Sequence, residues 1–307
     1  MTGAIEAFIG NTPLLQLKTD PGSARIFAKL ESFNPGGSVK DRVALAMIED
    51  AASRGLIRPE TVLLEATSGN TGIGLSLVAA ARGIPLVLVM PDSMSPERRK
   101  LLEAYGAQLI LTPGALGMQG AMARVEQVLA TDGNYLHLNQ FANPVNPRVH
   151  YQTTGPEIFR SLGKRIDCFV AGVGSGGTLT GTGGFLKSRL PGLKIIAVEP
   201  AQSPVLAGGK PGPHPLQGLG AGFIPPVLDL KLIDEIIAVE GDAAMEAARE
   251  LARSQGVLAG ISAGAQVWAA KKAARQLDPS GVVVTILPDS GERYLSTDLF
   301  GWREAPQ

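Results

Sequence analysis

The sequence predicts an α/β fold with open, parallel-rich sheets divided between two domains. Short runs rich in Val, Ile and Leu alternate with helical patterns, which is typical of βαβ units. The chain has 307 residues, and about 150 residues per domain is usual. Irregular sequence rich in Asn and Pro interrupts the alternation between about residues 135 and 146. We therefore expect a domain junction there.

The apolar runs predict the strands in chain order, at residues 61–66, 84–90, 108–112, 167–171, 194–199 and 282–287. A helix is expected after Ser95, because Ser95 suits the N-cap, Pro96 the first helical position and Gly106 the end. Residues 200–226 are dense in Gly and Pro. A loop this long inside a compact domain is often functional, so we expect it to cover or line a site.

Composition excludes several classes of protein. Hydrophobic residues make up 45% of the chain and charged residues 18%, so it is not a disordered protein. The 28 basic residues balance the 28 acidic ones, which argues against nucleic-acid partners and polybasic membrane binding. We therefore expect small-molecule partners, no nucleic acid and no membrane.

The small numbers of cysteines and histidines indicate the cellular compartment and limit the metal sites that the sequence allows. Cys168 is the single cysteine, which excludes an internal disulfide and a cysteine-based zinc site and fits a reducing compartment. With only three histidines, no metal site is predicted. The first six residues lack the basic and apolar regions of a secretory signal, so we expect a cytoplasmic location.

The first candidate site is the glycine-rich stretch Gly-Val-Gly-Ser-Gly-Gly at residues 172–177, between a predicted strand and a predicted helix. With Glu199 at the end of the next strand, it satisfies the dinucleotide-binding fingerprint. The pattern is not specific to dinucleotides. Glycines let backbone N–H groups approach any phosphate at a helix N-terminus. A phosphate site, a dinucleotide site and a structural turn stay open on this stretch alone.

A second strand-to-helix loop carries hydroxyl and amide side chains at residues 67–72, Thr-Ser-Gly-Asn-Thr-Gly. Ser68, Asn70 and Thr71, with the helix N-terminus, could hold the carboxylate of an amino acid. A capped helix start without a ligand is the alternative.

A third feature is the turn Asn-Pro-Gly-Gly-Ser-Val-Lys-Asp-Arg at residues 34–42, which leads into a helix expected to begin near Ser38. Lys40 then lies in the first turn, where the helix dipole disfavours a cation. A neutral amine is what Schiff-base chemistry needs. A solvated surface lysine is the alternative.

Together these motifs resemble the fold-type II pyridoxal-phosphate enzymes, and most closely the cysteine synthase family (O-acetylserine sulfhydrylases). The resemblance runs nearly end to end, and no single motif carries it. The matching segments are residues 9–14, 34–42, 67–72, 139–144, 153–157, 174–178, 217–225, 260–264 and 288–297.

The resemblance implies a role for each matching residue. Lys40 would form the internal aldimine with pyridoxal 5'-phosphate and later move protons at the amino-acid Cα. Asn70 would bond the ring oxygen, Ser262 would meet the pyridine nitrogen, and the cofactor phosphate would be cradled by Gly174, Ser175, Gly176, Gly177 and Thr178. The substrate carboxylate would be held by Thr67, Ser68, Thr71 and Gln140.

The implied activity is transfer by β-replacement, in which O-acetyl-L-serine and sulfide give L-cysteine and acetate through an α-aminoacrylate. The implied fold is tryptophan synthase β-subunit-like, with two three-layer αβα domains. Residues 41–145 would form a smaller mobile domain, and residues 1–40 with 146–307 a larger cofactor-binding one. A homodimer and a complex with serine acetyltransferase are the partners that the resemblance implies.

Two departures leave the thiol acceptor open. The chain has Ser262-Ala-Gly and Pro288-Asp-Ser-Gly, spellings that also resemble cystathionine β-synthases, whereas Ala221 and Gly222 follow the sulfhydrylase pattern. The alternatives are a cystathionine β-synthase, an O-phosphoserine sulfhydrylase, more remotely an NAD-dependent dehydrogenase, and a non-enzymatic binding protein on the same scaffold. Because Lys40 is present, the binding protein ranks low.

Two other residues receive a structural interpretation. Cys168 lies within an apolar strand pattern and is expected to be a small buried hydrophobe. His150 lies beside Tyr151 near the expected junction and is assigned to packing.

Overall fold

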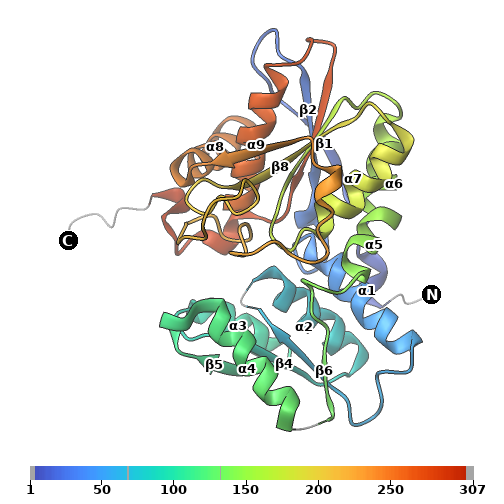
Figure 1. Cartoon of the computed structure of the whole chain (residues 1–307), viewed down its shortest axis with the longest axis vertical. Helices are drawn as coiled ribbons and strands as arrows, with labels where there is room; N and C mark the ends of the chain where they lie inside the picture. Colours follow the sequence, from blue (N-terminus) through green and yellow to red (C-terminus); the bar gives the residue numbers. More distant parts are fainter. Residues whose placement is uncertain (1–3, 68, 132, 302–307) are drawn as a thin grey trace, which may run out of the picture. The chain divides into compact units, whose positions relative to one another are not determined.

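The computed structural model of the chain describes residues 4–67, 69–131 and 133–301. The described residues divide into two compact units (Figure 1). The smaller unit contains the residues before Gly10 together with Asn34–Asn146, and the larger contains Gly10–Phe33 and the chain from Pro147 onward. The segment Asn34–Lys40 belongs to the smaller unit, whereas we expected the smaller domain to begin at residue 41.

The smaller unit is built on a sheet with the strand order β5-β4-β3-β6, in which every pairing is parallel. Its strands are β3 (Val62–Ala66), β4 (Leu86–Pro91), β5 (Gln108–Thr112) and β6 (Tyr135–His137). Its helices are α1 (Lys40–Ser53), α2 (Asn70–Arg82), α3 (Pro96–Ala104) and α4 (Gly117–Thr131).

Helices cover both faces of this sheet. Ala121 and Val125 of α4 pack on one face, in a cluster that includes Val89. A Cβ built on Gly72 of α2 would lie 3.3 Å from Leu88, whose side chain points to the other face because strand residues alternate. The smaller unit is therefore a three-layer αβα structure.

The larger unit is built on a sheet with the strand order β1-β2-β10-β7-β8-β9, parallel except for the antiparallel pair β1–β2. Its strands are β1 (Leu14–Leu17), β2 (Arg25–Leu30), β7 (Cys168–Gly172), β8 (Lys194–Pro200), β9 (Glu235–Val239) and β10 (Val282–Leu287). Its helices are α6 (Thr154–Leu162), α7 (Gly177–Arg189), α8 (Gly241–Gln255) and α9 (Ile261–Ala274), and α5 (Val145–Gln152) leads into it.

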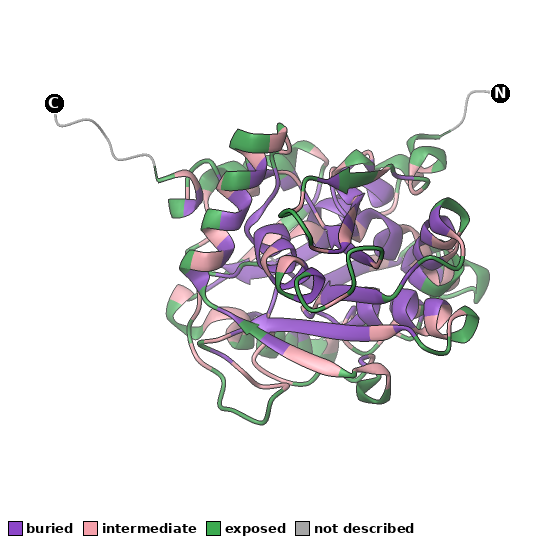
Figure 2. Ribbon diagram, turned by 90° about the horizontal axis from the view of Figure 1, so that it is seen from above, coloured by how far each residue is buried: buried purple, intermediate pink, exposed green. Residues whose placement is uncertain are grey.

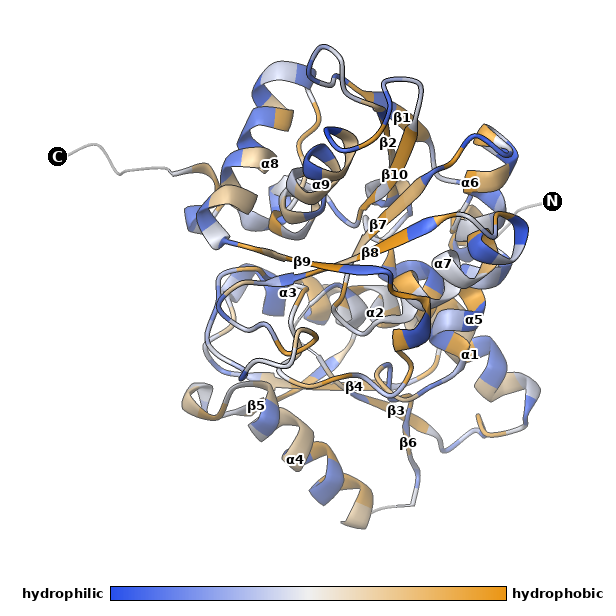
Figure 3. Ribbon diagram, turned by 45° about the horizontal axis from the view of Figure 1, so that its top comes forward, coloured by the Kyte–Doolittle hydropathy of each residue, from blue (hydrophilic) through white to orange (hydrophobic). Residues whose placement is uncertain are grey.

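Figure 1 shows α8 and α9 on one side of these strands and α6 and α7 on the other. Val170 and Val198 pack toward the first helix pair, and Phe169 and Ala197 toward the second, as the alternation of strand residues requires. Figure 2 shows the central strands as buried. The hydrophilic residues of α8 stand out in Figure 3 on a helix whose Ala244 and Leu251 are buried.

The predicted fold class is confirmed, and most predicted strands lie within a residue or two of the observed ones. Ser95 caps α3 by accepting a hydrogen bond from the Arg98 N–H, with Pro96 in the first helical position as predicted. Residues 201–226 form neither helix nor strand, as predicted for 200–226, except that Pro200 is the last residue of β8. Short 3-10 helices occupy Ile5–Phe8, Glu31–Phe33, Gly114–Leu116, Leu230–Leu232, Gly291–Tyr294 and Asp298–Phe300.

The prediction of irregular chain over residues 135–146 is wrong at both ends. Tyr135–His137 forms β6, and α5 begins at Val145. The three residues of β6 are only partly buried, so no apolar run marks this strand. The predicted helix near Ser38 begins two residues later, at Lys40.

Candidate active site

Lys40 is the first residue of α1, and a tight turn sets its position. The Gly36 N–H donates to the buried Asp41 carboxylate at 2.5 Å, and Gly37 has a φ of +76°. A Cβ built on Gly74 of α2 would lie 3.0 Å from the Lys40 carbonyl oxygen. The start of α1 therefore packs directly against α2, which places Lys40 beside the helix that follows the Thr67 loop.

The loop after β3 and the turn after β6 bring together Thr67, Thr71 and Gln140, three of the residues assigned to the substrate carboxylate. Thr67 and Thr71 are buried, and the Thr67 hydroxyl accepts the Gly69 N–H at 3.3 Å. The Thr71 hydroxyl donates to Oε1 of Gln140 at 2.6 Å. Asn70 opens α2, and Ser68 lies outside the described residues.

The glycine-rich loop connects β7 to α7 in the larger unit. Gly176 is the N-cap of α7 and has a φ of +85°, a conformation that favours glycine. A Cβ on Gly174 would lie 2.2 Å from the Gly218 carbonyl oxygen, so only glycine fits there. Ser175 is buried in the loop. The first turn of α7, including Gly177 and Thr178, presents its amides at the helix end.

Ser262 lies close to this loop, and the backbone of Gly218 connects the two. A Cβ on Gly218 would be 3.9 Å from the Ser262 hydroxyl, and the same residue's carbonyl faces Gly174. Ser262 is the second residue of α9 and is buried. The long loop thus brings Gly218 against both the glycine-rich loop and Ser262.

Sequence reasoning missed two residues that hold these elements. Gln266 accepts the Gly172 N–H at 2.9 Å and donates to the Ser262 carbonyl at 3.1 Å, so its amide connects β7 to the start of α9. His150 is fully buried, and its Nε2 lies 3.3 Å from the Thr178 hydroxyl. The Gln266–Gly172 and His150–Thr178 contacts join residues far apart in sequence, which no local pattern reports.

Glu199 does not have the surroundings that a dinucleotide site requires. Its carboxylate accepts the Leu206 N–H at 2.7 Å and the Ala207 N–H at 3.1 Å, so it holds the start of the long loop. Burial raises the pKa of Glu199, and these two hydrogen bonds offset part of that rise. A carboxylate already bound to its own chain is poorly placed to bind ribose hydroxyls.

Cys168 is buried, as expected, and burial raises the pKa of its thiol to about 12. The reactive thiolate is therefore absent at neutral pH. Among the described residues, no group of three or more His, Cys, Asp or Glu side chains could hold a metal ion. Within the same ranges no helix combines the length and hydropathy needed to cross a bilayer.

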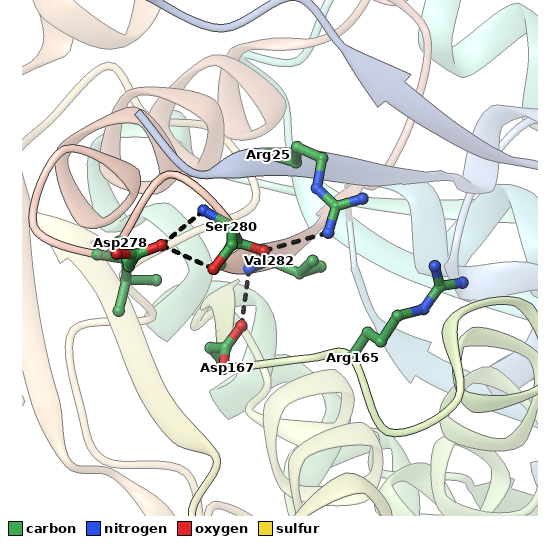
Figure 4. Close-up of a pocket in the computed structure, with 8 residues that line it drawn as sticks. Arg25, Arg165, Asp167, Asp278, Ser280 and Val282 are labelled. Carbon is green, nitrogen blue, oxygen red and sulfur yellow. Dashed lines mark hydrogen bonds between the residues drawn. The ribbon is translucent and has the colours of Figure 1, made fainter. Parts of the chain in front are cut away.

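A cavity of about 340 Å³ lies at the amino ends of β2, β7 and β10 (Figure 4). Its carboxylates serve the backbone: Asp167 accepts the Val282 N–H at 2.8 Å and Asp278 accepts the Ser280 N–H at 2.9 Å. Ligands of open parallel sheets bind at the carboxyl ends of the strands. The glycine-rich loop follows the carboxyl end of β7, so this cavity is not the candidate site.

Comparison with known proteins assigns the class. A family model described as "Pyridoxal-phosphate dependent enzyme" matches residues 5–289. The chain therefore belongs to the pyridoxal-phosphate dependent enzymes, and the family's cofactor is pyridoxal 5'-phosphate.

Named relatives narrow the class. A cysteine synthase of Staphylococcus aureus (strain Mu50) is 53% identical over 301 residues, covering 97% of each chain. The crystal structure of an Entamoeba histolytica cysteine synthase has a TM-score of 0.95 and 40% identity, covering 100% of this chain and 93% of that one. An O-acetylserine dependent cystathionine β-synthase of Helicobacter pylori has a TM-score of 0.92 and 39% identity, covering 98% and 99%.

The residues present fit this cofactor. Gly174 and Gly176 let the loop backbone pack against the Gly218 carbonyl and Leu228, where a Cβ would clash, and the loop ends at the N-terminus of α7. Backbone amides at a helix start suit a phosphate monoester. Ser262, buried at the start of α9, offers a neutral hydroxyl in the same unit.

Proposed function

We propose that the chain acts as a cysteine synthase, converting O-acetyl-L-serine and sulfide to L-cysteine and acetate. The observation that carries this proposal is the 53% identity to a cysteine synthase over 97% of both chains. The motif residues Lys40, Asn70 and Ser262 lie at helix starts, and Gln140 lies in the turn after β6, positions where functional side chains are common.

When bound, pyridoxal phosphate supplies an electron sink for the carbanion at the substrate Cα. Lys40 would hold the cofactor through Nζ and then take the proton from Cα of the substrate. Residues 174–178 would bind the phosphate, and Asn70 would orient the ring through its oxygen. Ser262 would face the ring nitrogen with a hydroxyl, which moderates the sink and favours loss of the β-substituent.

The substrate carboxylate would be bound by Thr67, Ser68, Thr71 and Gln140. The Thr71 hydroxyl donates to the Gln140 side-chain oxygen, so the amide NH₂ of Gln140 is left to donate to the carboxylate. Fixing the carboxylate and the amino group orients Cα relative to the amine of Lys40.

The main alternative is a cystathionine β-synthase, suggested by the Pro288-Asp-Ser spelling and by the Helicobacter pylori structure. The structure supplies another reason for Asp289: its buried carboxylate accepts the Tyr294 hydroxyl at 2.6 Å. A Cβ on Gly260 would lie 2.1 Å from the other oxygen of Asp289. Asp289 thus anchors the turn before α9, which explains its presence without a second amino-acid substrate.

The decisive experiment compares acceptors and donors. With O-acetylserine as donor, kcat/KM for sulfide should exceed that for homocysteine by at least roughly two orders of magnitude, because Ala221 and Gly222 offer no polar side chain to the second amino acid. Cysteine is measured colorimetrically and cystathionine by chromatography. Comparable values, or efficient cystathionine formation from serine, would assign the alternative. O-phosphoserine as the better donor would change the leaving group.

We also propose a homodimer, a cytoplasmic location, and association with serine acetyltransferase. The family resemblance supports the first and third, and the single buried Cys168 supports a reducing compartment. The smaller domain, residues 41–145, is proposed to move when substrate binds, with the cofactor held by the larger one. Light scattering with and without a serine acetyltransferase tests the assembly.

A further inference from the structure

The middle strand β3 of the smaller unit carries one charged residue, Glu65, in an otherwise apolar sequence. Its exposed fraction is 1%, and its neighbours Leu64 and Ala66 are buried against α4. Desolvating a carboxylate is costly unless hydrogen bonds or an opposite charge compensate it. A hydrophobic residue would fill this position at less cost, so the contacts of Glu65 need a reason.

Those contacts lead to the end of β6. This strand pairs with β3, and Figure 3 shows the two strands side by side. Oε2 of Glu65 accepts the backbone N–H of Asn139 at 2.8 Å, and Nε2 of His137 lies 3.8 Å from the same oxygen. Within the described residues, Oε1 of Glu65 is buried with no hydrogen-bond partner. The carboxylate is therefore directed at the turn that follows β6.

That turn has an uncommon backbone. Asn139 has a φ of +52°, in the left-handed region that non-glycine residues rarely adopt. Its side chain accepts the Ala142 N–H at 3.2 Å, and its carbonyl accepts the Asn143 N–H at 2.9 Å. A charged acceptor on the Asn139 N–H adds a strong hydrogen bond on the strand side of the turn.

The residue held in this way is Gln140. Its backbone follows Asn139 directly, and its carbonyl accepts the Asn146 side-chain N–H at 2.8 Å. Its side-chain oxygen accepts the Thr71 hydroxyl at 2.6 Å. The backbone of Gln140 is thus fixed by Glu65 on one side and Asn146 on the other, and its side chain meets the loop at the start of α2.

We infer that Glu65 is a positioning residue for substrate recognition: it fixes the Asn139 backbone so that the Gln140 amide stands beside Thr71 to receive the substrate carboxylate. This inference rests on the proposed function, because that function assigns Thr71 and Gln140 to the carboxylate. Glu65 itself touches neither substrate nor cofactor.

The test separates positioning from general stability. Glu65→Leu removes the acceptor at similar volume, and Glu65→Gln keeps an oxygen for the Asn139 N–H. Thr112→Val is the matched control, because it removes another buried polar group from the same sheet. Each holoenzyme is titrated calorimetrically with L-alanine, which has the carboxylate but no leaving group, and with L-alaninamide, which lacks the carboxylate.

We expect Glu65→Leu to weaken L-alanine binding and to raise the KM for O-acetylserine by about tenfold, with kcat changed by less than about threefold. L-alaninamide binding and cofactor content should not change. The preference for the carboxylate, which is the ratio of the affinities for L-alanine and L-alaninamide, should therefore fall. Glu65→Gln should restore most of the preference, and Thr112→Val should keep all of it. In a Gln140→Ala background, Glu65→Leu should add less than about twofold, because both changes remove the same interaction.

Equal losses for L-alanine and L-alaninamide, or additive effects with Gln140→Ala, would overturn the inference. If Glu65→Leu does not fold, Asn139→Val replaces it, because a β-branched residue disfavours the left-handed φ and should reproduce the same selectivity loss. A wild-type enzyme that does not bind L-alanine more tightly than L-alaninamide would instead contradict the proposed function. The two failures are therefore distinguishable.

Discussion

The imidazole of His150 connects two hydroxyl groups: Nε2 lies 3.3 Å from Oγ1 of Thr178 and Nδ1 lies 2.9 Å from Oγ1 of Thr154. Both threonines open helices, α7 and α6, so the ring links the glycine-rich loop to the neighbouring helix. A Cβ on Gly181 would lie 2.7 Å from the Cβ of His150, so α5 and α7 approach closely there. The packing role assigned from sequence therefore understates this residue.

His150→Ala should weaken cofactor binding by about tenfold, because a lost intramolecular hydrogen bond costs about 1 to 1.5 kcal/mol. The change acts on the orientation of the Thr178 hydroxyl. Binding of pyridoxal phosphate to apoenzyme is measured by the visible absorbance of the complex. Tyr151→Phe, at the exposed neighbouring position, is the control and should bind normally. Unchanged affinity in His150→Ala would show that the contact does not reach the cofactor.

Lys40 should be the residue that carries the cofactor covalently. Borohydride reduction of the holoenzyme, followed by digestion and mass spectrometry, should find a pyridoxyl group on the peptide containing Lys40. Lys40→Ala should give no such peptide, whereas the change Lys18→Ala at an exposed position should leave it in place. A pyridoxyl group on another lysine of the wild type would reject the assignment.

Gly174→Ala should abolish cofactor retention, because the new Cβ would lie 2.2 Å from the Gly218 carbonyl oxygen and one of the two backbones must move. The matched control is Gly192→Ala, where no atom lies within 4 Å of the new Cβ. Absorbance of the purified proteins reports cofactor content. Full content in Gly174→Ala would place the phosphate elsewhere.

Glu199→Ala should lower the free energy of unfolding. It should change neither the cofactor content nor the binding of NAD. Burial raises the pKa of Glu199 above its ordinary value near 4.5. At pH values between 4.5 and the raised pKa, Glu199 therefore binds a proton more readily in the folded state than in the unfolded state. Wild-type stability therefore falls as pH rises through this window, and the variant lacks that fall. Denaturant unfolding across the window measures the difference. Tight NAD binding lost in the variant would restore the dinucleotide hypothesis.

Cys168 should resist thiol reagents in the folded enzyme. Because burial raises its pKa to about 12, the thiol stays protonated up to pH values well above neutral. A colorimetric disulfide reagent should therefore label one thiol only after denaturation, and Cys168→Ser should abolish that labelling. Rapid labelling of the native wild type at neutral pH would contradict the buried position.

Sequence patterns predicted the strands whose signal is local. β5 and β10 match residue for residue, and the run of β10 is bounded by Gly281 and Pro288. β2 was missed because its sequence contains Arg25 and Lys29. Lys29 is nevertheless buried, since its Nζ lies 2.6 Å from Oε2 of Glu157. That partner is distant in sequence, so no window around Lys29 could reveal the compensation.

The same distinction holds for the candidate site. Motifs marked Lys40 and residues 174–178 because glycines and a lysine at helix starts are visible in the chain order. The residues that fix the glycine-rich loop, such as Gln266 and His150, act through contacts across 94 and 28 positions. Such contacts exist only after folding, so no local pattern marks Gln266, and the sequence alone assigns His150 to packing.

The antiparallel pair β1–β2 near the start of the chain joins its sheet through β10, near the end. During synthesis, the edge of β2 that pairs with β10 therefore stays unpaired until Val282–Leu287 has been made. Asn34–Asn146, by contrast, emerges as one continuous segment that holds every strand of its own sheet. The smaller unit can consequently fold early in synthesis, while the sheet of the larger one is completed only after Val282–Leu287 has been made.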